Sequence, residues 1–170
     1  MTITLAEGIK LKSILSKQIR ELEAEARRVA FMTVEKGTTP QPVSRTLSTV
    51  ENEMEQVRKD QRTLDFLIYQ ANSLNTVEFE GQQITLVEAI ELAIQLRAKA
   101  EFYKEFALAN KEEIQYGYAE TTTVYRLALF DPEAYRQKVQ QAEKSAHQLS
   151  NRINTKNYAI DLKFDGSNYF

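Results

Sequence analysis

Two Asn-x-x-Asn pairs are the most distinctive polar pattern in the sequence. One pair is Asn72 and Asn75, and the other is Asn154 and Asn157. Asparagine tolerates left-handed backbone, and its amide can satisfy the free carbonyls at the end of a helix. Helix capping is therefore one interpretation of both pairs. The other is that the pairs meet in the folded chain and form a polar site for a ligand or a partner.

Other residue types that carry chemistry are sparse. His147 is the only histidine and there is no cysteine, so this chain alone cannot build a histidine-paired nucleophile, a multi-histidine metal site or a thiolate metal site. No glycine-rich phosphate loop, G-x-S-x-G or H-E-x-x-H motif occurs. We therefore expect no catalytic residue, no cofactor and no metal site, and a non-enzyme rather than an enzyme.

The overall composition narrows the class of protein. The chain has 170 residues and a formal net charge of -2, so no basic field is available to hold nucleic acid. Its first ten residues lack the basic and apolar regions of a secretory signal, and no apolar run approaches the roughly 18 residues that span a bilayer. These features predict a cytoplasmic protein.

Helical patterns dominate the sequence. Thr4 with Glu7, and Thr85 with Glu88, form two capping boxes, each followed by a stripe of apolar residues at helical spacing. The first of these helices is expected to end at 32–35, before a breaker cluster at 36–42. The second is expected to end near residue 111. Its stripe is wider than the first, which predicts contact with two neighbours.

The segment 43–75 carries an a/d heptad pattern, which is typical of a helix packed along a partner helix. Gln61 interrupts the pattern. It could set the register or the oligomeric state, or lie where the packed face meets solvent. The apolar positions are Leu47, Val50, Met54, Val57, Leu64, Ile68 and Ala71.

The remaining elements are a fourth helix and short strands. Asp131 followed by Pro132 is a helix start, and this helix is expected to end at 154–157. Segments 76–79 and 83–84 predict a hairpin around Gly81, and 158–164 alternates as a strand does. The β-branched and aromatic segment 121–130 predicts a core strand, either one buried on both sides or one that pairs with 76–79 or 159–164 of the same or another chain.

The two halves of the chain resemble each other. Each contains a capping box, two helices, an Asn-x-x-Asn pair, a strand and an acid-glycine turn, which predicts a structural repeat of 4–81 and 85–166 about a pseudo-twofold axis. In this alignment Gln61 matches Glu143. The fold class is therefore mainly α with minor β. We expect a single domain, 1–170, with two antiparallel helical hairpins in a four-helix, coiled-coil-like bundle and short strands after each half.

Four short motifs stand out: the segment 5–12, Ile68 with Asn72 and Asn75, the segment 81–89, and Ile153 with Asn154, Asn157 and Tyr158. They resemble the septicolysin-like family of small bacterial helical proteins. They lie in family order across nearly the whole chain, although Tyr158 stands where the family usually has tryptophan, and only Tyr118-Ala119-Glu120 represents its Tyr-Ser-Arg segment. The family name implies a membrane-active cytolysin, and the resemblance implies no catalytic residue.

Three functions follow from these observations. The first is a self-associating structural or interaction module, because long helices with narrow apolar stripes leave surfaces for another chain to cover. We therefore expect a homo-oligomer. The second is a membrane-active, pore-forming cytolysin, for which dye release from liposomes is the test. The third is a small-ligand-binding protein with a site between the halves, lined by the four asparagines.

Overall fold

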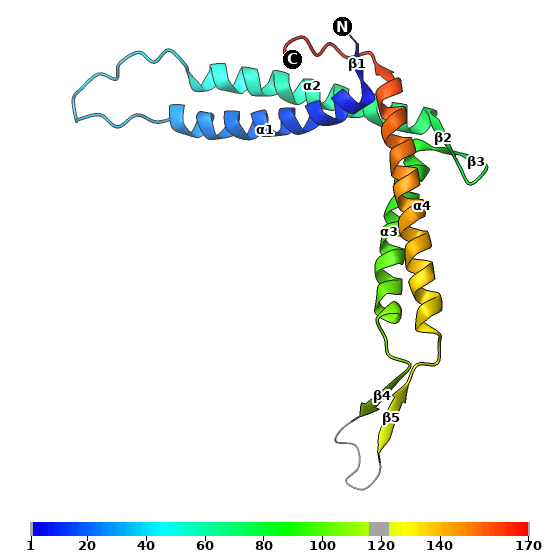
Figure 1. The fold of residues 1–170 in the computed structure, drawn as a ribbon. Helices are drawn as coiled ribbons and strands as arrows, with labels where there is room; N and C mark the ends of the chain where they lie inside the picture. Colours follow the sequence, from blue (N-terminus) through cyan, green and yellow to red (C-terminus); the bar gives the residue numbers. More distant parts are fainter. Residues whose placement is uncertain (1, 116–122, 170) are drawn as a thin grey trace. The chain divides into compact units, whose positions relative to one another are not determined.

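A computed structural model describes residues 2–115 and 123–169 (Figure 1). Four helices and three antiparallel strand pairs make up this part of the chain, which confirms the mainly α fold with minor β. The helices are α1 (Leu5–Val29), α2 (Leu47–Leu74), α3 (Leu86–Ala107) and α4 (Pro132–Ala159). The strands are β1 (Ile3–Thr4), β2 (Thr76–Phe79), β3 (Gln82–Thr85), β4 (Glu112–Gln115), β5 (Val124–Leu127) and β6 (Asp161–Leu162).

The chain divides into two compact units. Unit 1 comprises Met1–Leu74 and Lys156–Phe170, and unit 2 comprises Asn75–Thr155. Unit 1 holds the antiparallel helices α1 and α2 with the pair β1–β6. Unit 2 holds α3 and most of α4, the pair β2–β3 and the ribbon β4–β5. Each unit therefore has a helical hairpin at its centre.

Both capping boxes form as predicted. In α1, the Thr4 hydroxyl accepts a hydrogen bond from the Glu7 amide at 3.2 Å, and the Glu7 carboxylate accepts one from the Thr4 amide at 2.7 Å. Thr85 and Glu88 repeat this arrangement at 3.2 and 2.8 Å at the start of α3. The amide and hydroxyl donors of each threonine lower the pKa of its glutamate partner. Residues three positions apart therefore fix both helix starts.

The two units repeat one topology. In unit 1, β1 leads into α1 and pairs with β6, which follows α4; in unit 2, β3 leads into α3 and pairs with β2, which follows α2. The backbone hydrogen bonds correspond as well. The Leu5 amide donates to the Ile160 carbonyl at 2.8 Å, and the Leu86 amide donates to the Asn75 carbonyl at 2.9 Å. Ile160 is therefore the structural equivalent of Asn75.

This equivalence corrects the sequence alignment of the second helices by three residues. Phe79 and Phe164, both buried, keep the same offset as Asn75 and Ile160. Under this offset, Asn72 matches Asn157, and Gln61 matches Ala146 rather than Glu143. The buried positions of α2 and α4 then coincide: Met54, Val57, Leu64 and Ile68 match Val139, Ala142, Leu149 and Ile153.

One helix start and three helix ends differ from the predictions. Helix α2 begins at Leu47 because the Thr46 hydroxyl accepts a hydrogen bond from the Thr49 amide at 3.2 Å and so provides the cap. Helix α1 ends earlier than predicted, at Val29, and α3 ends earlier, at Ala107. Helix α4 ends later, at Ala159, immediately before the chain begins to pair with β1.

The strands follow the predictions only in part. The hairpin β2–β3 forms as predicted, and its turn residues Glu80 and Gly81 both have positive φ, at 50° and 80°. The prediction of a buried strand at 121–130 is wrong. Strand β5 covers only Val124–Leu127, is exposed along its length and pairs with β4, which the sequence did not predict. Thr121 and Thr122, like Tyr118-Ala119-Glu120, lie outside the described residues.

Candidate functional site

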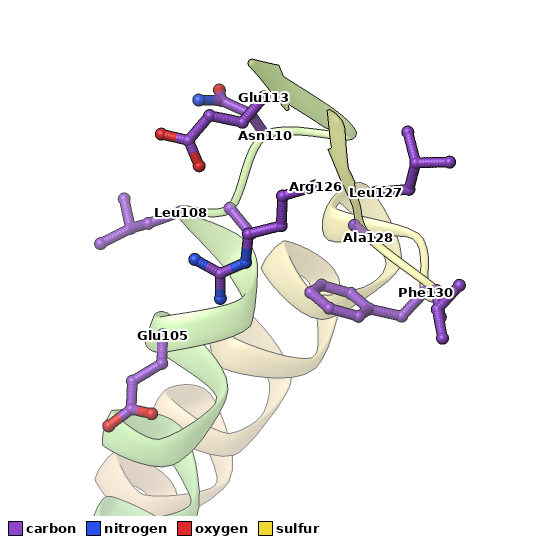
Figure 2. Close-up of a pocket in the computed structure, with 10 residues that line it drawn as sticks. Glu105, Leu108, Asn110, Glu113, Arg126, Leu127, Ala128 and Phe130 are labelled. Atoms are coloured by element: carbon purple, nitrogen blue, oxygen red, sulfur yellow. The ribbon is translucent and has the colours of Figure 1, made fainter. Parts of the chain in front are cut away.

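A hollow of about 550 Å³ lies where the ribbon β4–β5 joins the end of α3 (Figure 2). We call it the ribbon pocket. Its walls combine large apolar side chains with three charged groups, and every lining residue belongs to unit 2. The apolar side chains are Leu108, Leu127, Leu129 and Phe130, and the charged ones are Glu105, Glu113 and Arg126.

A cluster of aromatic rings holds one wall of the ribbon pocket in place. The Phe130 ring lies 5.3 Å from the rings of both Phe106 and Tyr135, edge to face in each case. Lys138 lies 4.3 Å above the Tyr135 ring, a cation–π contact. The guanidinium of Arg136 donates to the Ala107 carbonyl at 3.1 Å, which satisfies a free carbonyl at the end of α3. These contacts position Phe130 before any partner arrives.

The charges of the ribbon pocket are not neutralised within it. Glu113 and Arg126 are cross-strand partners, but Figure 2 shows the guanidinium beside the last turn of α3 and the Glu113 carboxylate turned away from it. None of the ion pairs in the described part of the chain involves Glu105, Glu113 or Arg126. The pocket therefore has two acidic groups and one basic group in its lining.

Unit 1 has a second hollow, of about 740 Å³, beside the segment that joins α1 to α2. We call residues 30–46 the connector. Every described residue from 31 to 44 is exposed. The apolar residues lining the hollow are Val29, Ala30, Phe31, Met32, Pro40, Pro42 and Val43, and the charged ones are Glu25, Arg28 and Arg45.

Arg45 fixes the base of the connector to both helices. Its guanidinium donates to both carboxylate oxygens of Glu25 on α1, at 2.7 and 2.9 Å. It also donates to both oxygens of Glu53 on α2, at 2.9 and 2.8 Å. These charge-assisted hydrogen bonds hold the pKa of each carboxyl below its ordinary value. One side chain thus ties the two helices together at the open end of the hairpin.

The Arg45 contacts predict a pH-dependent contribution to stability. A carboxyl whose pKa is lowered on folding stabilises the fold above its ordinary pKa, here 4.5, and loses that effect as pH falls through the lowered folded pKa. We expect Arg45→Gln to destabilise the protein more at pH 7 than at pH 3, as measured by urea unfolding. Arg62→Gln, which alters an exposed arginine of α2, is the control. An Arg45→Gln effect that is equal at both pH values would contradict the assignment.

Two comparisons with known proteins extend this description. The sequence model of a family of unknown function, DUF6847, matches residues 12–162. The chain belongs to the DUF6847 family. A crystal structure of a functionally unknown conserved protein from Corynebacterium diphtheriae is similar, with a TM-score of 0.66 and 24% identity over 96% of this chain and 100% of that chain. At this identity the likeness shows the fold alone. No curated protein matches the chain significantly.

The asparagine pairs of this DUF6847 protein differ in their surroundings. Asn75 follows the last residue of α2, and its carbonyl accepts the Leu86 amide. Asn72 lies in the last turn of α2, with a buried Oδ1 that has no hydrogen-bond partner among the described residues. Asn154 and Asn157 lie inside α4, so the prediction that this pair ends the helix is wrong. The predicted site where the pairs meet stays a prediction.

Gln61 and His147 have different surroundings. The Gln61 amide, half-buried, donates to the Ser16 hydroxyl on α1 at 2.7 Å, and Ser16 donates to the Lys12 carbonyl at 2.9 Å. A role in the register of the α1–α2 hairpin is consistent with this contact. His147 is exposed on α4.

The described residues contain neither a metal-binding cluster nor a membrane-spanning helix. Across residues 2–115 and 123–169, no group of three or more histidine, cysteine, aspartate or glutamate side chains could hold a metal ion. Within the same residues, every helix is too short or too polar to cross a membrane. The resemblance to the septicolysin-like family stays a prediction, because neither comparison bears on it.

Sequence reasoning missed the ribbon pocket. Its residues belong to a strand pair that exists only when β4 and β5 meet, and neither strand alternates clearly between polar and apolar residues. The wide apolar stripe of α3 did carry a usable signal, but for an apolar surface on the exposed side of that helix rather than for the pocket. One side of that helix is buried in unit 2, and the other is exposed.

Proposed function

We propose that this protein is a self-associating interaction module and that the outer face of α3 contacts a second copy. The outer face consists of side chains that follow one another at helical spacing and point away from the core of unit 2. Each is more than a third exposed, although burial of such side chains is favourable. They are Val87 (48%), Ile90 (38%), Ile94 (52%) and Phe102 (56%).

The internal repeat supports this proposal. Helix α1 is the equivalent of α3, so its outer face shows what the fold itself requires. Where α3 has Ile94 and Phe102, α1 has Ser13 and Glu21, and Glu21 forms an ion pair with Lys17 at 3.5 Å in solvent. At these two positions the same fold is thus built with polar side chains, whereas Val87 and Ile90 match Ala6 and Ile9. The exposed side chains of Ile94 and Phe102 are therefore not required by the fold itself.

The order of these residues favours an antiparallel contact between two identical helices. Val87 and Phe102 lie at similar distances on either side of Ile94, so a twofold axis near Ile94 places the valine of one copy against the phenylalanine of the other. Charge favours the same arrangement. The N-terminal half of α3 contains Glu88 and Glu91 but no base, whereas the C-terminal half has three bases and two acids. Antiparallel pairing brings the oppositely charged halves together.

The test compares one substitution on two equivalent helices. Ile94→Glu places two carboxylates against each other at the axis, and we expect it to raise the dimer dissociation constant at least about tenfold, or 1.4 kcal/mol. Ile9→Glu introduces the same change at an isoleucine of α1 that is 42% exposed, and should leave association unchanged. Sedimentation velocity over micromolar concentrations measures both. A wild-type protein that stays strictly monomeric would overturn the proposal.

A further inference from the structure

We propose that the connector of one copy binds in the ribbon pocket of a second copy. This inference rests on the proposed self-association, but it uses surfaces other than the outer face of α3. The connector and the ribbon pocket would form a second contact between copies of the chain. The contact joins two different surfaces, an apolar, basic segment and an apolar, acidic hollow.

The connector presents apolar side chains that its own unit does not cover. Phe31 is 86% exposed, Met32 48% and Val34 44%. Residues 31–35 form no helix or strand, so this stretch can extend along another surface. A phenylalanine this exposed is uncommon in a folded protein and is typical of a contact site.

The ribbon pocket offers matching apolar walls. Leu129 is 97% exposed and Leu108 is 82% exposed at its rim, and Phe130 forms a wall that its ring contacts hold still. A hollow of about 550 Å³ has room for an aromatic side chain together with its backbone. The ribbon itself has only two strands, and an isolated two-stranded sheet is marginally stable in water. A bound segment would therefore stabilise the ribbon as well as fill the pocket.

Charge decides which surfaces meet. Beside Phe31, the last turn of α1 carries Arg27 and Arg28, and the adjoining part of the connector carries Lys36 with a single acid, Glu35. Arg27 and Lys36 take part in none of the ion pairs in the described residues, whereas Arg28 lies 3.9 Å from Glu25. The ribbon pocket has the opposite balance of charge, two acids to one base.

Contacts between identical surfaces are disfavoured by the same charges. Two connectors would bring basic side chains together, and two ribbon pockets would bring Glu105 and Glu113 close to their own copies. Binding of a connector to a ribbon pocket avoids this repulsion. Because the two surfaces differ, each bound pair still has one connector and one pocket free. The contact therefore propagates into a ring or an open chain, unlike the closed pair formed through α3.

The experiment uses two variants that each lose one surface. Both are made in the Ile94→Glu background, which removes the proposed α3 contact. Phe31→Ser disables the connector, and Leu129→Ser disables the pocket. Both side chains are exposed, so circular dichroism should show unchanged folding. We expect each variant alone to be monomeric in sedimentation velocity and an equimolar mixture to form a 1:1 complex that cannot grow further.

Further variants and a salt series, measured in the same sedimentation assay, test the roles of charge and of Phe31. Glu113→Lys in the pocket-bearing partner should weaken the 1:1 complex at least about tenfold, and raising the salt concentration should weaken the unmodified complex. Phe66→Ser removes an aromatic side chain that is 63% exposed on α2, and should change nothing. A mixture that stays monomeric, or a Phe31→Ser variant that assembles as well as its parent, would overturn the inference.

The outcomes separate this inference from the proposed function. Wild-type protein that forms dimers and nothing larger would leave the α3 contact standing and refute the connector contact. Association that Ile94→Glu leaves unchanged and that Phe31→Ser abolishes completely would refute the α3 contact and support the connector contact.

Discussion

Replacing Leu64 by alanine is expected to lower the free energy of unfolding by about 2–5 kcal/mol. Leu64 is fully buried, at 0% exposure, in the packed face between α1 and α2. Truncation removes three carbon atoms from a close-packed interior and leaves a cavity that neighbouring helices cannot close completely. Urea unfolding followed by circular dichroism measures the effect. Leu149, also at 0% exposure, is the structural equivalent in unit 2, and Leu149→Ala should show an effect of similar size.

Leu74→Ala is the matched control for this first experiment. Leu74 ends the same helix as Leu64 but is 74% exposed, so its truncation leaves no cavity. We expect a change within about 0.5 kcal/mol, which is usual for surface substitutions. If Leu64→Ala and Leu74→Ala cost the same, Leu64 is not part of a packed core and the described arrangement of α1 and α2 is wrong.

Replacing Gly8 by valine is expected to cost about 1–3 kcal/mol, because the site has no room for a side chain. A Cβ atom at Gly8 would lie 2.7 Å from the Leu162 Cδ1 and 3.4 Å from the Leu64 Cδ1. The close approach of α1 to β6 therefore depends on glycine. Chemical denaturation measures the loss. Ser13→Val, at an exposed position of α1, controls for the helix propensity of valine.

The repeat suggests how this cost can be relieved. The equivalents of Gly8 and Leu162 in unit 2 are Ala89 and Val77, both buried. The glycine–leucine and alanine–valine pairs contain the same number of side-chain carbon atoms. We therefore expect Leu162→Val to reduce the cost of Gly8→Val, with a coupling energy of about 0.5–3 kcal/mol in a double-mutant cycle. Additive costs would show that Leu162 is not the side chain that excludes valine.

A self-associating chain with one symmetric and one asymmetric contact would have two separable assembly steps. The outer face of α3 would pair copies, and the connector would join pairs through the ribbon pocket. The outer face of α3 is mainly apolar, so a high salt concentration should not abolish the first contact. The connector contact depends more on charge, so salt should weaken it. These steps follow from the proposed function and the further inference, and the variants above distinguish them.

The sequence by itself determined the features that neighbouring residues control. Both capping boxes depend on a threonine and a glutamate three positions apart, and the β2–β3 turn depends on Gly81. The a/d pattern of α2 likewise marked its buried face. In the capping boxes and the turn, the groups that interact lie within a few residues of one another, and the buried face of α2 is marked by local spacing alone, so the chain encodes these features locally.

Only the tertiary structure decided which surface each remaining residue meets. Asn75 follows the end of a helix while Asn157 lies inside one, because α4 continues until Ile160 and Asp161 reach β1. The three-residue correction to the repeat, the exposed ribbon β4–β5 and the bare outer face of α3 arise in the same way. These features depend on contacts with residues that are distant in the sequence. Residue type and local spacing do not identify such contacts.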